Sequence, residues 1–224
     1  MRGMRKIVKF LHAYASWGFY MSDNASKVGN ALYSSGCLKF GSFRIKSGAL
    51  SPYYIDLACL LSSPEDLCTV TDIAANAVNR IAASIRIDKL ASIELKGALF
   101  LASIGCRTGL PCTVVRKEEK TYGATGRIAG AEVVRDEHVL FFDDVISEGL
   151  SKLEGIKPLE QLGAKVENIM VVVDREQGGR ENLEKAGYKV HALAKISEIV
   201  NSLLRKQHIS SGQAEAVLDY IKTL

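Results

Sequence analysis

Two kinds of hydrophobic pattern take turns along the chain. Short continuous apolar runs, typical of strands covered on both faces of a parallel sheet, occupy Leu90–Ile93, Cys112–Arg116, Val139–Phe142 and Val166–Asp174. Longer segments with helical spacing occupy Ser26–Ser35, Pro64–Ala83, Ala98–Thr108 and Gly149–Leu162. This alternation predicts an α/β fold with a mainly parallel central sheet flanked by helices.

Glycine and proline refine these elements. Gly36 is expected to end the first helix, and Phe43–Leu57 predicts a strand, a turn around Lys46-Ser47-Gly48 and a second strand. Pro158 predicts a kink or a division in the helix 149–162, because proline removes one helical hydrogen bond.

The first twenty residues, MRGMRKIVKFLHAYASWGFY, combine basic residues with an apolar, aromatic stretch. This order is typical of a secretory signal peptide, but His12 interrupts the apolar run and no small-residue cleavage site follows. After Met21, the residues Ser22–Asn24 can cap a helix that starts near Ala25. We therefore expect residues 1–21 to be an extension outside the fold, or the product of a start codon set too early, and residues 22–224 to form the folded domain.

The composition fits one compact domain that acts on a small molecule. A chain of 224 residues with 47% hydrophobic residues can bury one sizeable core. The net charge of +4 is modest and favours a small acidic substrate over a long nucleic acid. The five cysteines lack CxxC spacing, which indicates neither a disulfide framework nor a zinc site and favours a reducing cytoplasm.

The segment VLFFDDVISEGLS, Val139–Ser151, carries the strongest chemical signal. Asp143 and Asp144 follow a predicted strand at the edge of the sheet where ligands bind in open α/β folds. Two adjacent carboxylates repel unless hydroxyl donors, a metal ion or a base offset their charge, and the diol of a ribose supplies such donors. The next turn carries the Ser147 and Ser151 hydroxyls and opens a helix, whose N–H groups favour a phosphate. A bare Asp-Asp pair more often marks a strand end before a helix N-cap, so the prediction of a ribose phosphate site depends on the whole segment.

Cationic residues at two other places fit an anionic substrate. Lys96 comes between a predicted strand and a helix, where its ammonium can meet a pyrophosphate. Arg116, Lys117 and Lys120 gather just before a glycine-containing stretch. This stretch is either a mobile loop that closes over an anionic substrate and excludes water, or a polar hairpin with an exposed basic face.

The Val139–Ser151 segment resembles the phosphoribosyl pyrophosphate (PRPP) signature of the type I phosphoribosyltransferases, which is an apolar strand, two acidic residues and a Thr/Gly turn. Three more segments are similar to the orotate phosphoribosyltransferases of that family and follow the same order. They are FRIKSGALSPYYIDL (Phe43–Leu57), VVRKEEKTYGATGRIAG (Val114–Gly130) and VVVDREQGGRENLEKAGY (Val171–Tyr188). With their spacing, these matches cover Ser26–Val200.

The resemblance implies a type I phosphoribosyltransferase fold with a small N-terminal hood built largely from residues 22–60. It also implies transfer of the phosphoribosyl group from PRPP to orotate, giving orotidine 5′-monophosphate and pyrophosphate in pyrimidine biosynthesis. Mg²⁺ is the implied cofactor, held mainly by PRPP and water rather than by the protein. A cytoplasmic homodimer is implied in which loop 117–130 acts in trans, at the neighbouring subunit's site. Neither a nucleic acid nor a membrane is expected as a partner, whereas a complex with a separate orotidine monophosphate decarboxylase is compatible with the chain.

Matching positions give the expected site residues. Lys120, Asp143 and Asp144 are expected to be catalytic. The residues expected to bind PRPP are Lys96, Arg116, Lys117, Lys120, Tyr122, Asp143, Asp144, Val145, Ile146, Ser147, Glu148, Gly149, Leu150 and Ser151. The residues expected to bind orotate are Lys46, Tyr53, Tyr54, Ser147 and Arg175.

Four positions depart from the usual family pattern. Ser147 replaces threonine and keeps its hydroxyl, whereas Leu150 stands where a small or hydroxylated residue is usual. Ala49 replaces a frequent arginine, and Tyr122 replaces a frequent histidine. We expect these changes to affect rate and affinity more than the type of reaction.

Two alternative functions stay open from the sequence. One is a non-catalytic regulator that binds PRPP, and the presence of Lys117 and Lys120 argues against it. The other is a type I phosphoribosyltransferase for another base. Lys46 and Arg175 argue against a purine, because a purine has no carboxylate for their charges to bind.

Overall fold

The computed structural model describes residues 23–45, 48–120 and 126–223, and of Lys120 it describes only the backbone. The expected extension of residues 1–21 lies outside the described residues. So do two expected site residues, Lys46 and Tyr122, and the middle of the basic segment, 121–125.

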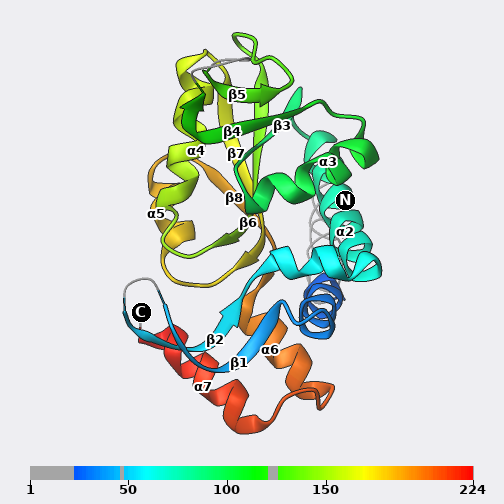
Figure 1. Ribbon diagram of the computed structural model, residues 1–224, viewed down its shortest axis with the longest axis vertical. Coiled ribbons are helices and arrows are strands. Elements are labelled where there is room, and N and C mark those ends of the chain that lie inside the picture. Colours follow the sequence, from blue (N-terminus) through cyan, green and yellow to red (C-terminus); the bar gives the residue numbers. More distant parts are fainter. Residues whose placement is uncertain (1–22, 46–47, 121–125, 224) are drawn as a thin grey trace, which may run out of the picture.

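A six-stranded sheet forms the centre of the molecule (Figure 1). Every neighbouring pair of strands is parallel except β4 and β5. This confirms the predicted α/β fold with a mainly parallel sheet. In spatial order the strands are β5 (Gly126–Gly130), β4 (Cys112–Lys120), β3 (Lys89–Ile93), β6 (His138–Ile146), β7 (Lys165–Asp174) and β8 (Lys189–Lys195).

Helices cover both faces of this sheet, and each face has its own hydrophobic core (Figure 1). Phe142 belongs to the core under α2 and α3, and its neighbour Phe141 belongs to the core under α4 and α5. Successive side chains of a strand point to opposite faces, so a continuous apolar run serves both cores. The four helices are α2 (Pro64–Ala82), α3 (Lys96–Thr108), α4 (Leu150–Gln161) and α5 (Gly179–Lys185).

The sequence predicted a kink or a division of helix α4 at Pro158. The structure shows no division there. Pro158 is buried inside the helix, which continues to Gln161. A proline has a backbone φ that fits a helix, and its main cost is one missing hydrogen bond. Packing of the buried face of α4 against the sheet keeps the helix in one piece.

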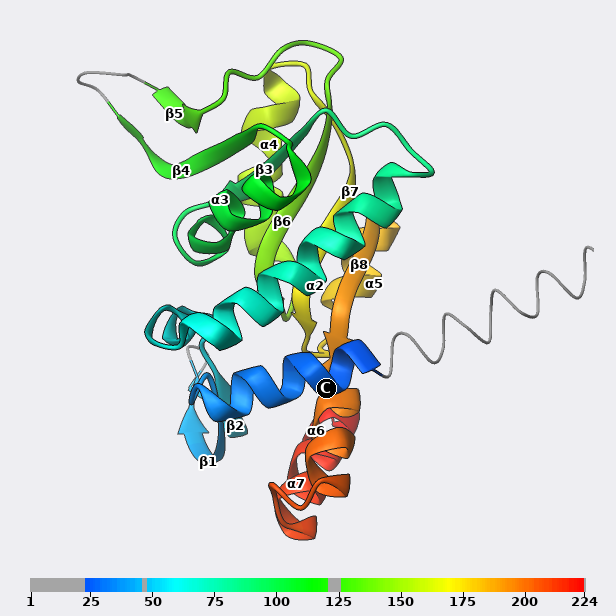
Figure 2. The ribbon, with the colours of Figure 1, turned by 90° about the vertical axis from the view of Figure 1, so that its right-hand side faces the viewer.

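A small antiparallel pair of strands, β1 (Leu38–Arg44) and β2 (Leu50–Ile55), forms a hood beside the carboxyl ends of the main strands (Figure 1). The helix of residues 23–34 lies alongside α2, as Figure 2 shows, and the short 3-10 helix η1 (Leu57–Ser62) follows β2. The first hood strand begins before the predicted Phe43. The register of β1 shifts between Phe40 and Phe43, so the strand lacks the regular alternation of apolar and polar residues that would have predicted its first residues.

The last two helices, α6 (Ile196–Arg205) and α7 (Ser211–Lys222), come from the other end of the described chain and pack at the same end of the molecule. Helix α7 packs against β2, where the rings of Tyr53 and Tyr220 meet edge to face with centroids 6.3 Å apart. The hood is therefore supported by both ends of the described chain.

Strand β6 extends beyond its apolar run. Its ladder with β7 continues through Asp143, opposite Val171, to Ile146, opposite Asp174. Asp143 and Asp144 therefore lie within the last part of the strand and not after it, so that backbone hydrogen bonds to β7 fix their positions.

The basic segment forms part of an antiparallel hairpin in its described residues. Strand β4 runs to Lys120, and Val115 pairs with Ile128 of β5. Its arms agree with the polar hairpin that was one of the two structures expected from the sequence. Among the helices of the described residues, none is both long and apolar enough to cross a membrane.

Candidate active site

Four of the expected site residues lie where the parallel strands end. Lys96 follows β3, Asp143 and Asp144 are at the end of β6, and Arg175 follows β7. Two contacts join these ends to the hood: Lys96 Nζ lies 3.0 Å from Asp56 Oδ1, and Arg175 Nε donates to the Tyr53 hydroxyl at 3.0 Å. These contacts place the four residues at the boundary between the sheet and the hood, at the carboxyl ends of the strands, where ligands usually bind in open α/β folds.

The two carboxylates are both buried, with 5% of Asp143 and 6% of Asp144 exposed. Asp143 Oδ1 accepts the backbone N–H of Asp144 at 2.9 Å. Burial raises the pKa of Asp144 to about 6, and the charge of Asp143 adds to this shift, while Lys152 opposes it. At neutral pH the Asp144 carboxyl is therefore mostly charged, although it is close to its titration range.

Lys152 offsets part of the negative charge of the two buried carboxylates. The sequence analysis did not predict this residue as part of the site. Its side chain is buried in the first turn of α4, and its Nζ lies 2.5 Å from Asp143 Oδ2. A signal was present: Lys152 precedes the buried residues Gly155, Ile156 and Leu159 at helical spacing, so it occupies an apolar-face position. A lysine on that face needs a buried anion as its partner.

The turn between β6 and α4 is shaped to receive an anion. Gly149 is the N-cap of α4 with a φ of 88°, no side chain caps the helix, and its first turn contains no acidic residue. The first N–H groups of α4 are thus left for a ligand. Leu150 is exposed, and Ser151 Oγ accepts a hydrogen bond from Lys152 Nζ at 3.3 Å.

This turn also touches the next one along the sheet. A Cβ at Gly149 would lie 3.0 Å from the carbonyl oxygen of Gly179, and a Cβ at Gly179 would overlap the carbonyl of Ser147. The loops after β6 and β7 are therefore in backbone contact, which only glycine permits at this distance.

Lys96 is the first residue of α3, and 44% of its side chain is exposed. Burial lowers its pKa, but the hydrogen bond and charge of Asp56, with the charge of Asp144, outweigh this effect and raise it. Its neighbour Gly97 lies so close to β6 that a Cβ would overlap Ser92 Oγ and Asp143. The close approach brings the start of α3 next to the acidic pair. Asp56, which the sequence analysis did not select, fixes Lys96 from the hood side.

On the hood side, Tyr53 supports Arg175. The Tyr53 ring is fully buried, and the Arg175 guanidinium carbon lies 4.9 Å from its centroid. Because Nε is bonded to the Tyr53 hydroxyl, the terminal nitrogens of Arg175 remain as the fork for a ligand. Tyr54 points away from this core and is partly exposed, with its ring centroid 5.7 Å from that of Phe43.

Arg116 and Lys117 of the hairpin make hydrogen bonds to two different parts of the structure. Arg116 Nη1 donates to the Gly126 carbonyl at 2.9 Å, and the backbone N–H of Lys117 donates to Glu94 Oε1 at 2.7 Å. The Lys117 contact joins the hairpin to the loop after β3, close to Lys96. The side chain of Lys120 lies outside the described residues.

The amino-acid sequence is also similar to those of known proteins. No protein-family model matches the chain. The orotate phosphoribosyltransferase of Pyrococcus abyssi is 36% identical over 168 residues, which are 75% of this chain and 91% of that protein.

Two solved structures share the fold. The structure of Leishmania donovani UMP synthase is similar with a TM-score of 0.80 and 28% identity, over 89% of this chain and 42% of that one. The crystal structure of orotate phosphoribosyltransferase from Aeropyrum pernix gives a TM-score of 0.69 and 25% identity, over 82% of this chain and 99% of that one. The identities, the shared fold and the residues at the strand ends together show that the chain belongs to the orotate phosphoribosyltransferase family.

Proposed function

We infer that this protein transfers the phosphoribosyl group of PRPP to orotate and releases orotidine 5′-monophosphate and pyrophosphate in pyrimidine biosynthesis. The observation that carries this function is the family membership, which extends over most of the chain. The site supports it independently, because it combines a buried acidic pair, an uncapped helix N-terminus and an arginine fork around one crevice.

In this proposal the PRPP residues form three groups. Asp143 and Asp144 accept hydrogen bonds from the ribose diol. The turn from Val145 to Ser151 binds the 5-phosphate, with backbone N–H groups compensating for the apolar side chain of Leu150. Lys96 meets the pyrophosphate, and the hairpin residues Arg116, Lys117, Lys120 and Tyr122 close over it.

Orotate is proposed to bind between the hood and the end of β7. The terminal nitrogens of Arg175 bind its carboxylate in a bidentate manner, because Tyr53 holds the guanidinium from behind. Lys46, Tyr54 and Ser147 complete the proposed base site. The ring nitrogen N1 of orotate, already deprotonated, attacks ribose C1 as the bond from C1 to the pyrophosphate oxygen breaks.

Mg²⁺ is the proposed cofactor. Within the described residues no group of three or more His, Cys, Asp or Glu side chains is arranged to hold a metal ion. Asp143 Oδ2 is paired with Lys152, so the acidic pair fits a hydrated Mg²⁺ carried mainly by PRPP oxygens, with Asp144 as its acidic neighbour. When bound, Mg²⁺ supplies charge stabilisation for the leaving pyrophosphate.

The protein side of catalysis is positioning and charge stabilisation. Lys96 and the hairpin cations offset the negative charge that develops on pyrophosphate, and Lys120 is proposed to donate a proton to it. Closing the hairpin excludes water from the ribosyl cation as it develops. We further propose that the enzyme is a cytoplasmic homodimer whose loop 117–130 completes the neighbouring site. All five cysteines are free, which suits a reducing compartment.

The activity itself is tested by the loss of orotate ultraviolet absorbance with PRPP and Mg²⁺, with uracil, hypoxanthine and adenine as competing acceptors. We expect PRPP-dependent consumption of orotate alone. Turnover of a different base would identify the protein as a type I phosphoribosyltransferase for that base. Binding of PRPP without any turnover would make it a regulator.

The arginine fork is tested by Arg175→Lys. Because lysine cannot form the bidentate contact, we expect the KM for orotate to rise about 10- to 100-fold while the KM for PRPP stays nearly unchanged. Tyr53→Phe removes only the hydroxyl behind Arg175 and should give a smaller rise. Tyr188→Phe, whose hydroxyl contacts Glu160 away from the site, is the control. Equal effects on both substrates would contradict the assignment.

The buried ammonium is tested by Lys152→Met. We expect a loss of roughly 3 kcal/mol in the free energy of unfolding at pH 8, because two buried carboxylates then lack their cation. Lys152 lowers the pKa of Asp144, so the variant carboxyl titrates above about 6. A carboxyl whose pKa is raised by folding destabilises the folded state fully above the raised pKa, and this cost shrinks as the pH falls below that value toward the unfolded-state pKa. The loss should therefore shrink at pH 5.

Urea unfolding at both pH values measures this dependence. Lys157→Met, an exposed position of the same helix, is the matched control and should change stability little at either pH. A loss that is the same at pH 5 and pH 8 would mean that Lys152 acts through packing and not through charge.

The action of the loop in trans is tested by mixing two inactive variants, Lys120→Ala and Asp144→Asn, after subunit exchange. Half of the dimers become hybrids, and each hybrid has one site with neither defect, so about a quarter of the wild-type activity should return. A mixture of Asp143→Asn with Asp144→Asn serves as the control and should stay inactive. No recovery in the first mixture, with exchange verified, would place Lys120 in its own subunit's site.

A further inference from the structure

Arg175 lies in a short loop after β7 that is held by hydrogen bonds at successive residues. The N–H of Arg175 donates to the Ile146 carbonyl oxygen of β6 at 3.0 Å. The next N–H, that of Glu176, donates to Asp174 Oδ1 at 2.9 Å. Glu176 has a φ of 55°, in the left-handed region that favours glycine. A residue with a side chain keeps this conformation only where surrounding contacts enforce it.

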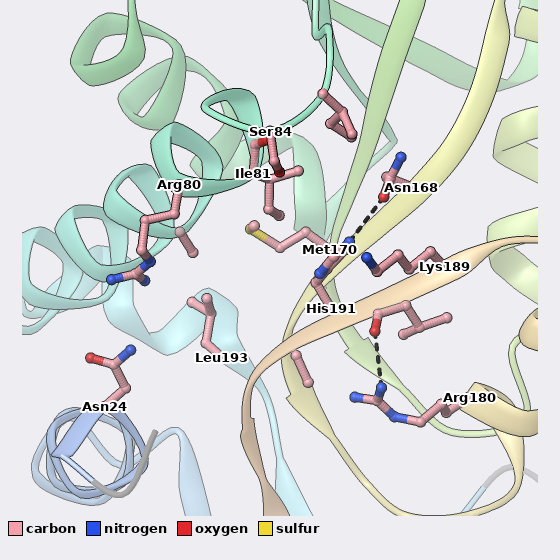
Figure 3. Close-up of a pocket in the computed structure, with 14 residues that line it drawn as sticks. Asn24, Arg80, Ile81, Ser84, Asn168, Met170, Arg180, Lys189, His191 and Leu193 are labelled. Atoms are coloured by element: carbon pink, nitrogen blue, oxygen red, sulfur yellow. Dashed lines mark hydrogen bonds between the residues drawn. The ribbon is translucent and has the colours of Figure 1, made fainter. Parts of the chain in front are cut away.

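Asp174 supports the loop from the sheet side. It is buried, with 3% exposed, and its Oδ2 accepts a hydrogen bond from Arg180 Nε at 2.9 Å. Arg180 Nη1 in turn donates to the Val190 carbonyl oxygen of β8 at 2.9 Å, and Figure 3 shows this contact at the wall of a cavity between α2 and β8. Both oxygens of Asp174 are therefore engaged in holding the loop to the last strands of the sheet.

The side chain of Glu176 ties the other side of the loop to α6. Its Oε2 accepts the N–H of Ser197, the second residue of that helix, at 2.9 Å. This N–H has no partner within the helix, and the helix dipole favours a carboxylate at this end. Because the left-handed turn and the contact with α6 belong to the same residue, the contact can enforce the turn.

Helix α6 also belongs to the core that supports Tyr53, the hood residue bonded to Arg175. Ile199 and Leu203 of α6 are buried in one cluster with Tyr53, and α7 packs against both α6 and β2. Burial raises the pKa of the Tyr53 hydroxyl, the charge of Arg175 opposes this shift, and the charge of Glu176 adds to it. Arg175 is thus held at its side chain by Tyr53 and at its backbone through Glu176, and both supports depend on the same packed helices.

A second carboxylate at the start of α6 provides a comparison. Glu198 Oε2 accepts the backbone N–H of Lys195 at 3.0 Å. Glu198 and Glu176 are both partly exposed, and both bond an N–H at this helix end, but only Glu176 is next to Arg175 in the chain. The helix therefore has a carboxylate of its own in its first turn, and the contact with Glu176 serves the loop.

We propose that Glu176 is a positioning residue for orotate. By holding the loop after β7 against α6, it keeps the terminal nitrogens of Arg175 in place for the substrate carboxylate before orotate binds. An arginine that is already held loses less conformational freedom on binding, so the affinity for orotate is higher. This inference rests on the proposed function of the site.

Steady-state kinetics of the full chain test this role with three substitutions. Glu176→Ala removes the contact with Ser197, so the KM for orotate should rise about fivefold, the value of one helix-capping contact, with kcat and the KM for PRPP nearly unchanged. Glu176→Gln keeps an acceptor oxygen and should raise it about twofold or less. Glu176→Gly fits the left-handed φ but lacks the contact, so it should resemble the alanine variant.

Glu198→Ala is the matched control. It removes a comparable contact at the start of α6 and should leave the KM for orotate unchanged. In an Arg175→Lys background the bidentate contact is already lost, so Glu176→Ala should have little further effect if it acts through Arg175.

The Arg175 Nε–H proton gives a readout that needs no turnover. It is bonded to the Tyr53 hydroxyl, so in NMR spectra of the ligand-free protein it should exchange slowly with water. In Glu176→Ala we expect exchange about fivefold faster, and in Glu198→Ala the wild-type rate. If the wild-type protein does not consume orotate, the proposed function fails, and this exchange rate alone decides whether Glu176 positions Arg175.

Several results would overturn the positioning role. They are a wild-type KM for orotate in either the alanine or the glycine variant, equal rises in the KM for orotate and for PRPP, and the same rise in Glu198→Ala. A full additional effect of Glu176→Ala in the Arg175→Lys background, or an unchanged exchange rate of the Nε–H proton, would also contradict it.

Discussion

The contact between Lys152 and Asp143 is the condition on which the rest of the site depends. Two adjacent carboxylates at the buried end of a strand repel each other and lose their hydration, and either effect alone would favour protonation or unfolding. An ammonium 2.5 Å away offsets one of these charges from inside the protein. The neighbouring carboxylate then stays available to a ligand, with its pKa raised but still below neutral. The ion pair also ties α4 to β6, so it positions the helix N-terminus that is proposed to hold the phosphate.

Polar contacts join the hood to the sheet. Asp56 reaches Lys96, and Tyr53 reaches Arg175, so two of the cationic side chains proposed to meet a substrate are held by hood residues. Burial of Tyr53 under α7 makes its contact firm, whereas the pair of Lys96 and Asp56 is partly exposed and weaker. The contact proposed to face the base is therefore firmer than the contact proposed to face the pyrophosphate. This difference suits a site where the pyrophosphate has to leave.

Local patterns could predict much of this structure, and contacts between distant elements could not. The strands β3, β4, β6 and β7, the turn after β6 and the positions of Asp143, Lys96 and Arg175 follow from short apolar runs and their flanking residues. The continuation of β6 to Ile146 depends on pairing with β7, and the uninterrupted α4 depends on packing against the sheet. Lys152 and Asp56 were missed because their partners come from other elements. Helical spacing places Lys152 on the apolar face of α4, but it does not identify Asp143 as the partner.

The backbone contact between Gly149 and Gly179 couples the turn after β6 to the turn after β7. Each glycine leaves the space that the other loop's main chain occupies, so neither position can accept a side chain without displacing the neighbouring loop. The turn after β6 and the turn after β7 then behave as one rigid rim. A substitution of either glycine would therefore disturb both turns at once, although the two positions are 30 residues apart in the sequence.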